Sequence, residues 1–170
     1  MILIHTALLC EAQSFIEYYK LKKINSKIYS NDKIVILISG VGKQKTIKEL
    51  NNVFSQYSIK KAFNIGIAGC NDEEVTISSL FCTNKHLKNF NFLPLITKDE
   101  ITTDSIETSS TLYDMEAKYF EEAISEKLTK DSIFVFKIVS DHLSKERLAK
   151  DFIKKIIANQ KNLHKFIQEK

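Results

Sequence analysis

The chain has 170 residues, of which 44% are hydrophobic and 27% are charged, and its formal net charge is +4. These values are ordinary for a globular protein with one buried core. The basic residues are scattered from Lys20 to Lys170 among acidic ones and include a single arginine, Arg147. A nucleic-acid groove requires clustered basic side chains, so the composition disfavours nucleic acid as a partner.

The cysteines and the amino terminus indicate the compartment. Three cysteines, Cys10, Cys70 and Cys82, form no Cys-x-x-Cys motif and are an odd number, which is typical of a reduced chain. The apolar amino terminus lacks the basic residues of a secretion signal and is interrupted at Glu11. No apolar run approaches the length that spans a membrane. We therefore expect a cytoplasmic protein without a membrane partner.

Apolar runs alternate with segments whose apolar residues have helical spacing. In chain order these patterns predict a strand over 2–9, a helix over 11–19, strands over 27–30 and 33–38, a helix over 47–57, strands over 61–67, 76–83 and 92–97, a helix over 115–128, a strand over 132–139 and a final helix over 145–167. This alternation favours a three-layer α/β/α sandwich around a mostly parallel, mixed central sheet. No linker divides the chain, so residues 1–170 are predicted to form a single domain.

All four glycines follow predicted strands. Gly40 and Gly42 lie in a loop after the strand over 33–38, and Gly66 and Gly69 lie in a second loop that follows the apolar run 62–65. A chain this poor in glycine uses it where the backbone needs a positive φ or a close approach to another group. Glycine turns at the carboxyl ends of parallel strands mark the ligand crevice of an open α/β sheet. The sequence therefore predicts its binding site at this edge.

Acidic residues occupy similar positions. Glu11 and Asp141 each follow a predicted strand, and Asp114 and Glu116 open a predicted helix. Each has a structural explanation, because acidic residues stabilise helix N-termini and Asp is a common N-cap. Gathered at one sheet edge, the same carboxylates would suit a reaction whose transition state carries positive charge.

Five segments at these strand ends occur in a recognisable order: Ala7–Ala12, Ser39–Lys43, Asn64–Gly69, Asp114–Ala117 and Val139–Asp141. Together they resemble the nucleoside phosphorylase/nucleosidase superfamily, on its methylthioadenosine/S-adenosylhomocysteine nucleosidase side. The resemblance covers most of the chain. It implies the phosphorylase/hydrolase-like fold, a purine nucleoside as substrate, a homodimer as the assembly, and no cofactor or metal.

The resemblance implies cleavage of an N-glycosidic bond. Asp141 would protonate the leaving purine and Glu11 would orient or deprotonate the attacking water. Glu116 would accept hydrogen bonds from the ribose hydroxyls, with Met115 packed beneath the sugar. The resemblance implies further substrate contacts at Ser39, Gly40, Gly66, Ile67 and Ser140. A neutral leaving base needs a proton donor and an oxocarbenium-like sugar is stabilised by nearby carboxylates, which agrees with these roles.

Three functions remain open. Phosphate-binding sites favour arginine, whose planar fork holds an oxyanion with two hydrogen bonds, and the only arginine is predicted in the last helix, outside every motif. We therefore favour water as the nucleophile. A phosphorylase that holds its phosphate co-substrate with Lys43 and backbone amides is the alternative enzyme. A nucleoside-binding or accessory protein without activity is the third possibility.

The segment between Gly69 and Asp114 is shorter than in typical nucleosidases. That segment would supply part of the base pocket in the family that the chain resembles. Candidates for the remaining contacts with the base are Phe90, Phe92, Glu100 and Ile101.

Overall fold

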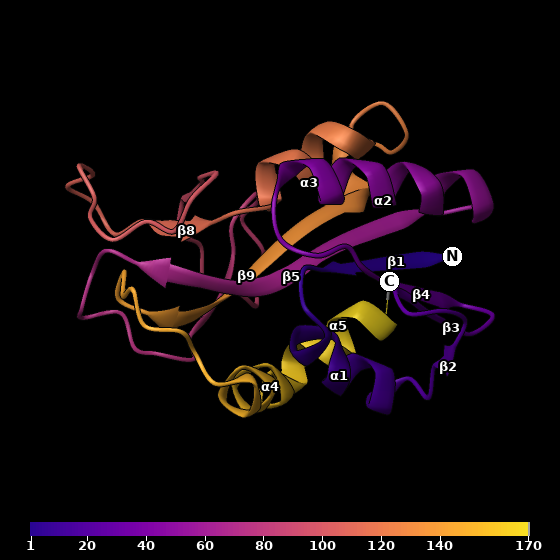
Figure 1. Ribbon diagram of the computed structural model, residues 1–170, viewed down its shortest axis with the longest axis horizontal. Coiled ribbons are helices and arrows are strands. Elements are labelled where there is room, and N and C mark those ends of the chain that lie inside the picture. Colours follow the sequence, from indigo (N-terminus) through magenta and orange to yellow (C-terminus); the bar gives the residue numbers. More distant parts are fainter. Residues whose placement is uncertain (170) are drawn as a thin grey trace.

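Figure 1 shows the computed structural model of the chain, which describes residues 1–169. The strands are β1 (Ile2–Thr6), β2 (Lys22–Lys23), β3 (Ile28–Ser30), β4 (Ile34–Ile38), β5 (Lys61–Cys70), β6 (Leu80–Cys82), β7 (Leu95–Thr97), β8 (Leu112–Asp114) and β9 (Ile133–Asp141). The helices are α1 (Leu9–Tyr18), α2 (Lys43–Gln56), α3 (Ala117–Ile124), α4 (Lys150–Ala158) and α5 (Lys161–Gln168), with a 3₁₀ turn at Lys130–Ser132.

Parallel strands form the centre of the sheet, in the order β4, β1, β5 and β9. These strands are buried over most of their length, which explains their nearly continuous apolar sequences. Antiparallel pairs extend the sheet: β3 joins β4, β2 joins β3, β6 joins β9, and β8 joins the end of β5. Because the central strands are parallel, their carboxyl ends meet at one edge.

Helices cover both faces of the sheet (Figure 1). On one face α1, α4 and α5 bury a core that includes Phe15 and Ile157. On the other face α2 and α3 bury a second core that includes Leu50 and Phe120. This arrangement confirms the predicted α/β/α sandwich. Among residues 1–169, no helix combines the length and the apolarity that crossing a bilayer requires.

The predicted final helix over 145–167 is wrong. The chain forms two helices, α4 and α5, and Gln160 between them leaves helical geometry with φ −82° and ψ 59°. Residues 142–149 form a loop, because the Asp141 carboxylate accepts a hydrogen bond from the Ser144 N–H at 2.9 Å and Leu143 turns the backbone with φ 55°. Arg147 consequently lies in this loop instead of the last helix.

The two glycine segments differ in structure. Gly40 and Gly42 form a turn with φ of 87° and 96°, as the sequence predicts. Gly66 and Gly69 instead lie within β5, which continues to Cys70. The predicted second loop is therefore strand, and its glycines allow close approach of other groups: a Cβ at Gly66 would lie 2.8 Å from Glu11 Oε1, and a Cβ at Gly69 would lie 3.0 Å from Leu143 Cδ2.

Several further boundaries differ from the predictions. The strand predicted over 2–9 ends at Thr6, with α1 beginning at Leu9, and the helix predicted over 47–57 begins at Lys43. The strand over 76–83 is reduced to β6, and β8, which was not predicted, ends at Asp114. The helix predicted over 115–128 begins at Ala117, because the Asp114 carboxylate accepts the Ala117 N–H at 2.8 Å and so caps α3 from outside the helix.

Candidate active site

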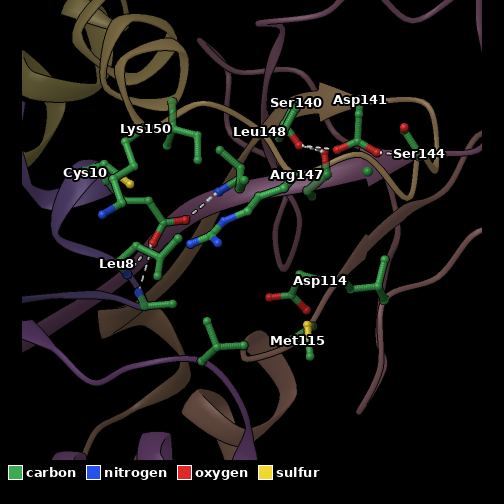
Figure 2. Close-up of a pocket in the computed structure, with 18 of the residues that line it drawn as sticks. Leu8, Cys10, Asp114, Met115, Ser140, Asp141, Ser144, Arg147, Leu148 and Lys150 are labelled. Atoms are coloured by element: carbon green, nitrogen blue, oxygen red, sulfur yellow. Dashed lines mark hydrogen bonds between the residues drawn. The ribbon is translucent and has the colours of Figure 1, made fainter.

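A pocket of about 730 Å³ lies at the carboxyl edge of the central strands (Figure 2). Its walls come from the β1–α1 junction at 7–11, from β5 at 67–69, from 113–116 before α3, and from the end of β9 with the loop that follows it. Small-molecule sites have volumes of about 300–1,000 Å³, so this pocket has the right size for a nucleoside-sized ligand.

Six of the predicted site residues line the pocket: Glu11, Ile67, Met115, Glu116, Ser140 and Asp141. The other three do not line it: Ser39, Gly40 and Gly66. The structure therefore brings the three predicted carboxylates into one cavity, although their positions in the sequence are far apart.

Ser39 and Gly40 belong to a buried network behind the pocket wall. The Ser39 hydroxyl donates to the Gly40 carbonyl at 2.8 Å and lies 2.8 Å from His5 Nε2. Asn64 Nδ2 lies 2.8 Å from the other ring nitrogen of His5. Burial lowers the pKa of His5 to about 3, so the ring is neutral at physiological pH. This network fixes the glycine turn that follows β4.

Glu11 is held by backbone donors. The N–H groups of Ala7 and Leu8 donate to Oε2 at 3.0 and 2.8 Å, and the N–H of Ile67 donates to Oε1 at 3.0 Å. Burial raises the pKa of Glu11, while Lys137 and these N–H groups oppose the increase. Glu11 thus stabilises the start of α1, as expected for an acidic residue in the first turn of a helix. Its carboxylate also faces the pocket.

Glu116 connects the start of α3 to the glycine turn. Its Oε1 accepts a hydrogen bond from the Gly42 N–H at 2.9 Å. Within residues 1–169 no hydrogen bond to Oε2 is present, so that oxygen is available to a ligand hydroxyl. Burial raises the pKa of Glu116 to about 7, and the charge of Lys137 limits the increase.

Asp141 is positioned by two serines. Its Oδ1 accepts the Ser144 N–H, and its Oδ2 lies 2.6 Å from the Ser140 hydroxyl, which is also 3.2 Å from the Ala68 carbonyl. A hydroxyl has one proton to donate. When Asp141 is ionised, Ser140 donates to it. When Asp141 is protonated, it donates to Ser140, which donates to Ala68. The site therefore accommodates both protonation states of Asp141.

A buried ion pair lies beneath these carboxylates. Lys137 Nζ is 2.7 Å from Asp114 Oδ2, and their side chains are 2% and 0% exposed. Burial would lower the pKa of Lys137, but Asp114, Glu116 and Glu11 together raise it. The ammonium therefore stays charged and offsets part of the negative charge of the site. Asp114 is fixed in turn by the Thr97 hydroxyl at 2.6 Å.

Several solved nucleosidases have a similar architecture. The 5′-methylthioadenosine/S-adenosylhomocysteine nucleosidase (MTAN) of Helicobacter pylori has a TM-score of 0.79 at 11% identity, covering 99% of this chain and 97% of that chain. The futalosine hydrolase of the same organism has a TM-score of 0.77 at 12% identity, and the match covers 99% of this chain and 98% of that chain. The MTAN of Chlamydia trachomatis has a TM-score of 0.75 at 14% identity, and the match covers 97% of this chain and 95% of that chain. This chain has the nucleosidase fold. No family model matches its sequence, and no curated protein sequence matches it significantly.

Lys137, which forms the buried ion pair, was not singled out from the sequence. Its partner Asp114 was noted among the carboxylates of this sheet edge but was given no separate role. The available signal was the position of Lys137 inside an apolar strand, because a lysine is almost never fully buried unless it is paired. Its partner could not be identified, since β8 was not predicted.

The four residues that the sequence suggested for contacts with a base separate into two pairs. Glu100 and Ile101 line the pocket. Phe90 instead packs in the core, with its ring 4.9 Å from that of Phe136, and Phe92 is not part of the lining. Arg147, which the sequence placed outside every motif, also lines the pocket, from the loop before α4.

Proposed function

We propose that this protein cleaves the N-glycosidic bond of a purine nucleoside with water and releases the free base. The observation that carries the proposal is the convergence of Glu11, Glu116 and Asp141 in one pocket at the carboxyl edge of the sheet. The solved neighbours support the ligand class. A point mutant of H. pylori MTAN holds 5′-methylthioadenosine in its active site, and the C. trachomatis MTAN is bound to adenine.

Asp141 is the general acid of this proposal. In its protonated form it would donate its proton to N7 of the purine, so that the base leaves as a neutral molecule. The Ser140 hydroxyl, 2.6 Å from Oδ2, can then turn to donate to the newly formed carboxylate. Asp141 would therefore be stabilised after the transfer without movement of the backbone.

Glu11 would bind and deprotonate the attacking water. Three N–H donors fix its carboxylate, so its remaining lone pairs have defined directions. Water adds its hydroxyl to C1′ of the sugar and its proton passes to Glu11, while the bond from C1′ to the base breaks. Lys137 does not line the pocket and would act as a positioning residue that keeps the nearby carboxylates ionised.

Glu116 and Met115 would hold the sugar. The Oε2 atom of Glu116 would accept hydrogen bonds from the ribose hydroxyls, since Oε1 is occupied by Gly42. Met115 lines the pocket and offers an apolar surface beneath the ring. The ionised carboxylates also lie where positive charge develops on the sugar in the transition state.

The geometry disfavours the phosphorylase that relies on Lys43. The Lys43 ammonium lies over the ring of Tyr119, 5.2 Å from its centroid, and Lys43 does not line the pocket. The Gly42 N–H, which would be a phosphate donor, is already bonded to Glu116. A negatively charged phosphate would also lie close to Glu11, which favours water as the nucleophile.

The proposal is tested by incubating the protein with 5′-methylthioadenosine, S-adenosylhomocysteine, futalosine, adenosine and inosine, and measuring the free base by chromatography. We expect base release from at least one of them in phosphate-free buffer. Release that requires phosphate would indicate the phosphorylase. Tight binding without release, measured by calorimetry, would indicate the nucleoside-binding protein.

The raised pKa of Glu116 predicts a pH dependence of substrate affinity. Below pH 7 its Oε2 carries a proton and becomes a donor, so it no longer accepts hydrogen bonds from ribose. A single protonation weakens affinity by about tenfold for each pH unit below the pKa. We therefore expect KM to rise as the pH falls from 7 to 5.5, and to be nearly constant above pH 8. A KM that is flat over this range, or a Glu116→Gln variant with the same profile as the wild type, contradicts this role.

Gly66 predicts a steric test of the Glu11 position. A Cβ at this residue would lie 2.8 Å from Glu11 Oε1 and 3.5 Å from Lys137 Nζ. Gly66→Ala must therefore displace the carboxylate from the Ile67 N–H. Because displacement of a catalytic group by about 1 Å can cost about 100-fold, we expect a large loss of kcat. Thermal unfolding checks that the variant folds, and wild-type kcat in folded Gly66→Ala protein would exclude the role of Glu11.

We also propose that two copies of the chain associate. Leu9, Val41 and Ile101 line the pocket, and their side chains are unusually exposed for apolar residues. Covering them with a second copy would bury apolar surface and narrow the pocket entrance. Light scattering of the purified protein should give the mass of a dimer, about twice 19.6 kDa. A monomer at micromolar concentration contradicts this proposal.

A further inference from the structure

Three cations line the pocket among the described residues, and all belong to the segment after β9: Arg147, Lys150 and Lys154. Glu146 and Asp151 of the same segment also line it, so this wall carries both signs of charge. None of the three cations has a role in the hydrolysis described above.

Arg147 is the cation best placed to contact a ligand. Figure 2 shows its side chain extending across the pocket toward Leu8. Within residues 1–169 its guanidinium makes no hydrogen bond and no ion pair. By contrast, Lys154 is bonded to Glu17 at 3.0 Å. An unpaired guanidinium presents five donors in a planar fork that matches the two oxygens of a carboxylate or phosphate.

The wall with Arg147 is the one left for the far end of a bound nucleoside. Figure 2 shows Asp141 on one side of the pocket, Met115 on a second side, and Cys10 with Lys150 on a third. A base at Asp141 and ribose hydroxyls at Glu116 leave the 5′ substituent to point toward the third side. The group on this substituent is then the part of the ligand that Arg147 can reach.

We propose that Arg147 binds an anionic group, a carboxylate or a phosphate ester, on the 5′ substituent of the nucleoside, so that the preferred substrates are negatively charged. This inference rests on the proposed function. It names a specificity-determining residue outside the catalytic carboxylates. A free phosphate is the other source of the same chemistry, but as a nucleophile it would have to lie next to the Glu11 carboxylate, which repels it.

The test compares kcat/KM for adenosine, adenosine 5′-monophosphate and adenosine 5′-carboxylic acid, in the wild type, in Arg147→Met and in Arg147→Lys. Charge-assisted hydrogen bonds predict that the wild type prefers at least one anionic nucleoside over adenosine by about 10- to 100-fold. This ratio should fall to near 1 in Arg147→Met and to an intermediate value in Arg147→Lys, which keeps the charge but loses the fork. Lys145→Met, an exposed neighbour that does not line the pocket, should keep the wild-type ratio.

The outcomes separate this inference from the proposed function. A wild-type ratio near 1, or a ratio unchanged by Arg147→Met, overturns the role of Arg147 even if adenosine is cleaved. Cleavage that requires inorganic phosphate and that Arg147→Met abolishes also overturns it, because the anion is then a co-substrate. If no compound is cleaved, the proposed function fails, and calorimetric binding of the same three compounds still decides the inference by the same ratios.

Discussion

Asp141→Asn is expected to lower the rate of base release by about 100- to 10,000-fold, which is the usual contribution of a general acid. The substitution is nearly isosteric. The Asn side-chain oxygen can still accept the Ser144 N–H, and its amide group can donate to Ser140, so the fold and the loop before α4 should be retained. The variant cannot supply a proton to the leaving base. We therefore expect nucleoside binding to persist while turnover is lost.

Single-turnover measurements of base release, together with calorimetric binding of the same nucleoside, check this prediction. Asp131→Asn is a matched control, because Asp131 is exposed and precedes β9 at the end opposite to the pocket. Wild-type turnover in Asp141→Asn would remove the general acid from the mechanism. Loss of both binding and folding would instead assign Asp141 to the structure of the loop.

Lys137→Met should have the largest effect on stability. The substitution leaves the Asp114 carboxylate buried without its partner, and breaking a buried ion pair in this way costs about 3–5 kcal/mol. It also removes the positive charge that lowers the pKa of Glu116. We therefore expect a large decrease in the free energy of unfolding, and a rise of the pH at which KM begins to increase. Urea unfolding and a KM profile between pH 5.5 and 9 measure these effects.

A second substitution separates the two effects of Lys137. In Lys137→Met with Asp114→Asn the buried charge is gone, so part of the stability should return. The KM profile should return only in part: the loss of the Asp114 charge removes one cause that raises the pKa of Glu116, but the larger effect of the Lys137 ammonium is still missing. Lys130→Met, at an exposed lysine in the turn before β9, should change the free energy of unfolding by less than about 0.5 kcal/mol. An unchanged stability of Lys137→Met would show that the ion pair contributes nothing to the fold.

The centre of the fold was predictable because parallel strands buried on both faces are continuous apolar runs. This holds for β1, β4, β5 and β9. The short strands were harder to predict from the sequence. β8 has three residues and pairs with only two residues of β5, so its existence depends on contacts distant in sequence. The break between α4 and α5 has no glycine or proline, and one apolar stripe runs through both helices, which explains the single predicted helix.

The candidate site was predictable where its residues follow strands. Glu11 and Asp141 were found in this way, and Glu116 by its position at a helix start. Lys137 was missed because within β9 it occupies a strand position like any other, and only the fold reveals the carboxylates around it. The location of Arg147 depended on where α4 begins. The sequence predicted a helix from residue 145, which would contain Arg147. In the structure α4 begins at Lys150, so Arg147 lies in the preceding loop and lines the pocket.

The most direct test of nucleoside hydrolysis is the stoichiometry of products from the best purine nucleoside in phosphate-free buffer. Free base is quantified by chromatography and the sugar by its reducing end. Attack by water predicts equal amounts of base and reducing sugar, with rates that do not depend on added phosphate. Appearance of a sugar 1-phosphate when phosphate is added, or absence of any base from folded protein across the whole panel, would contradict hydrolysis at this pocket.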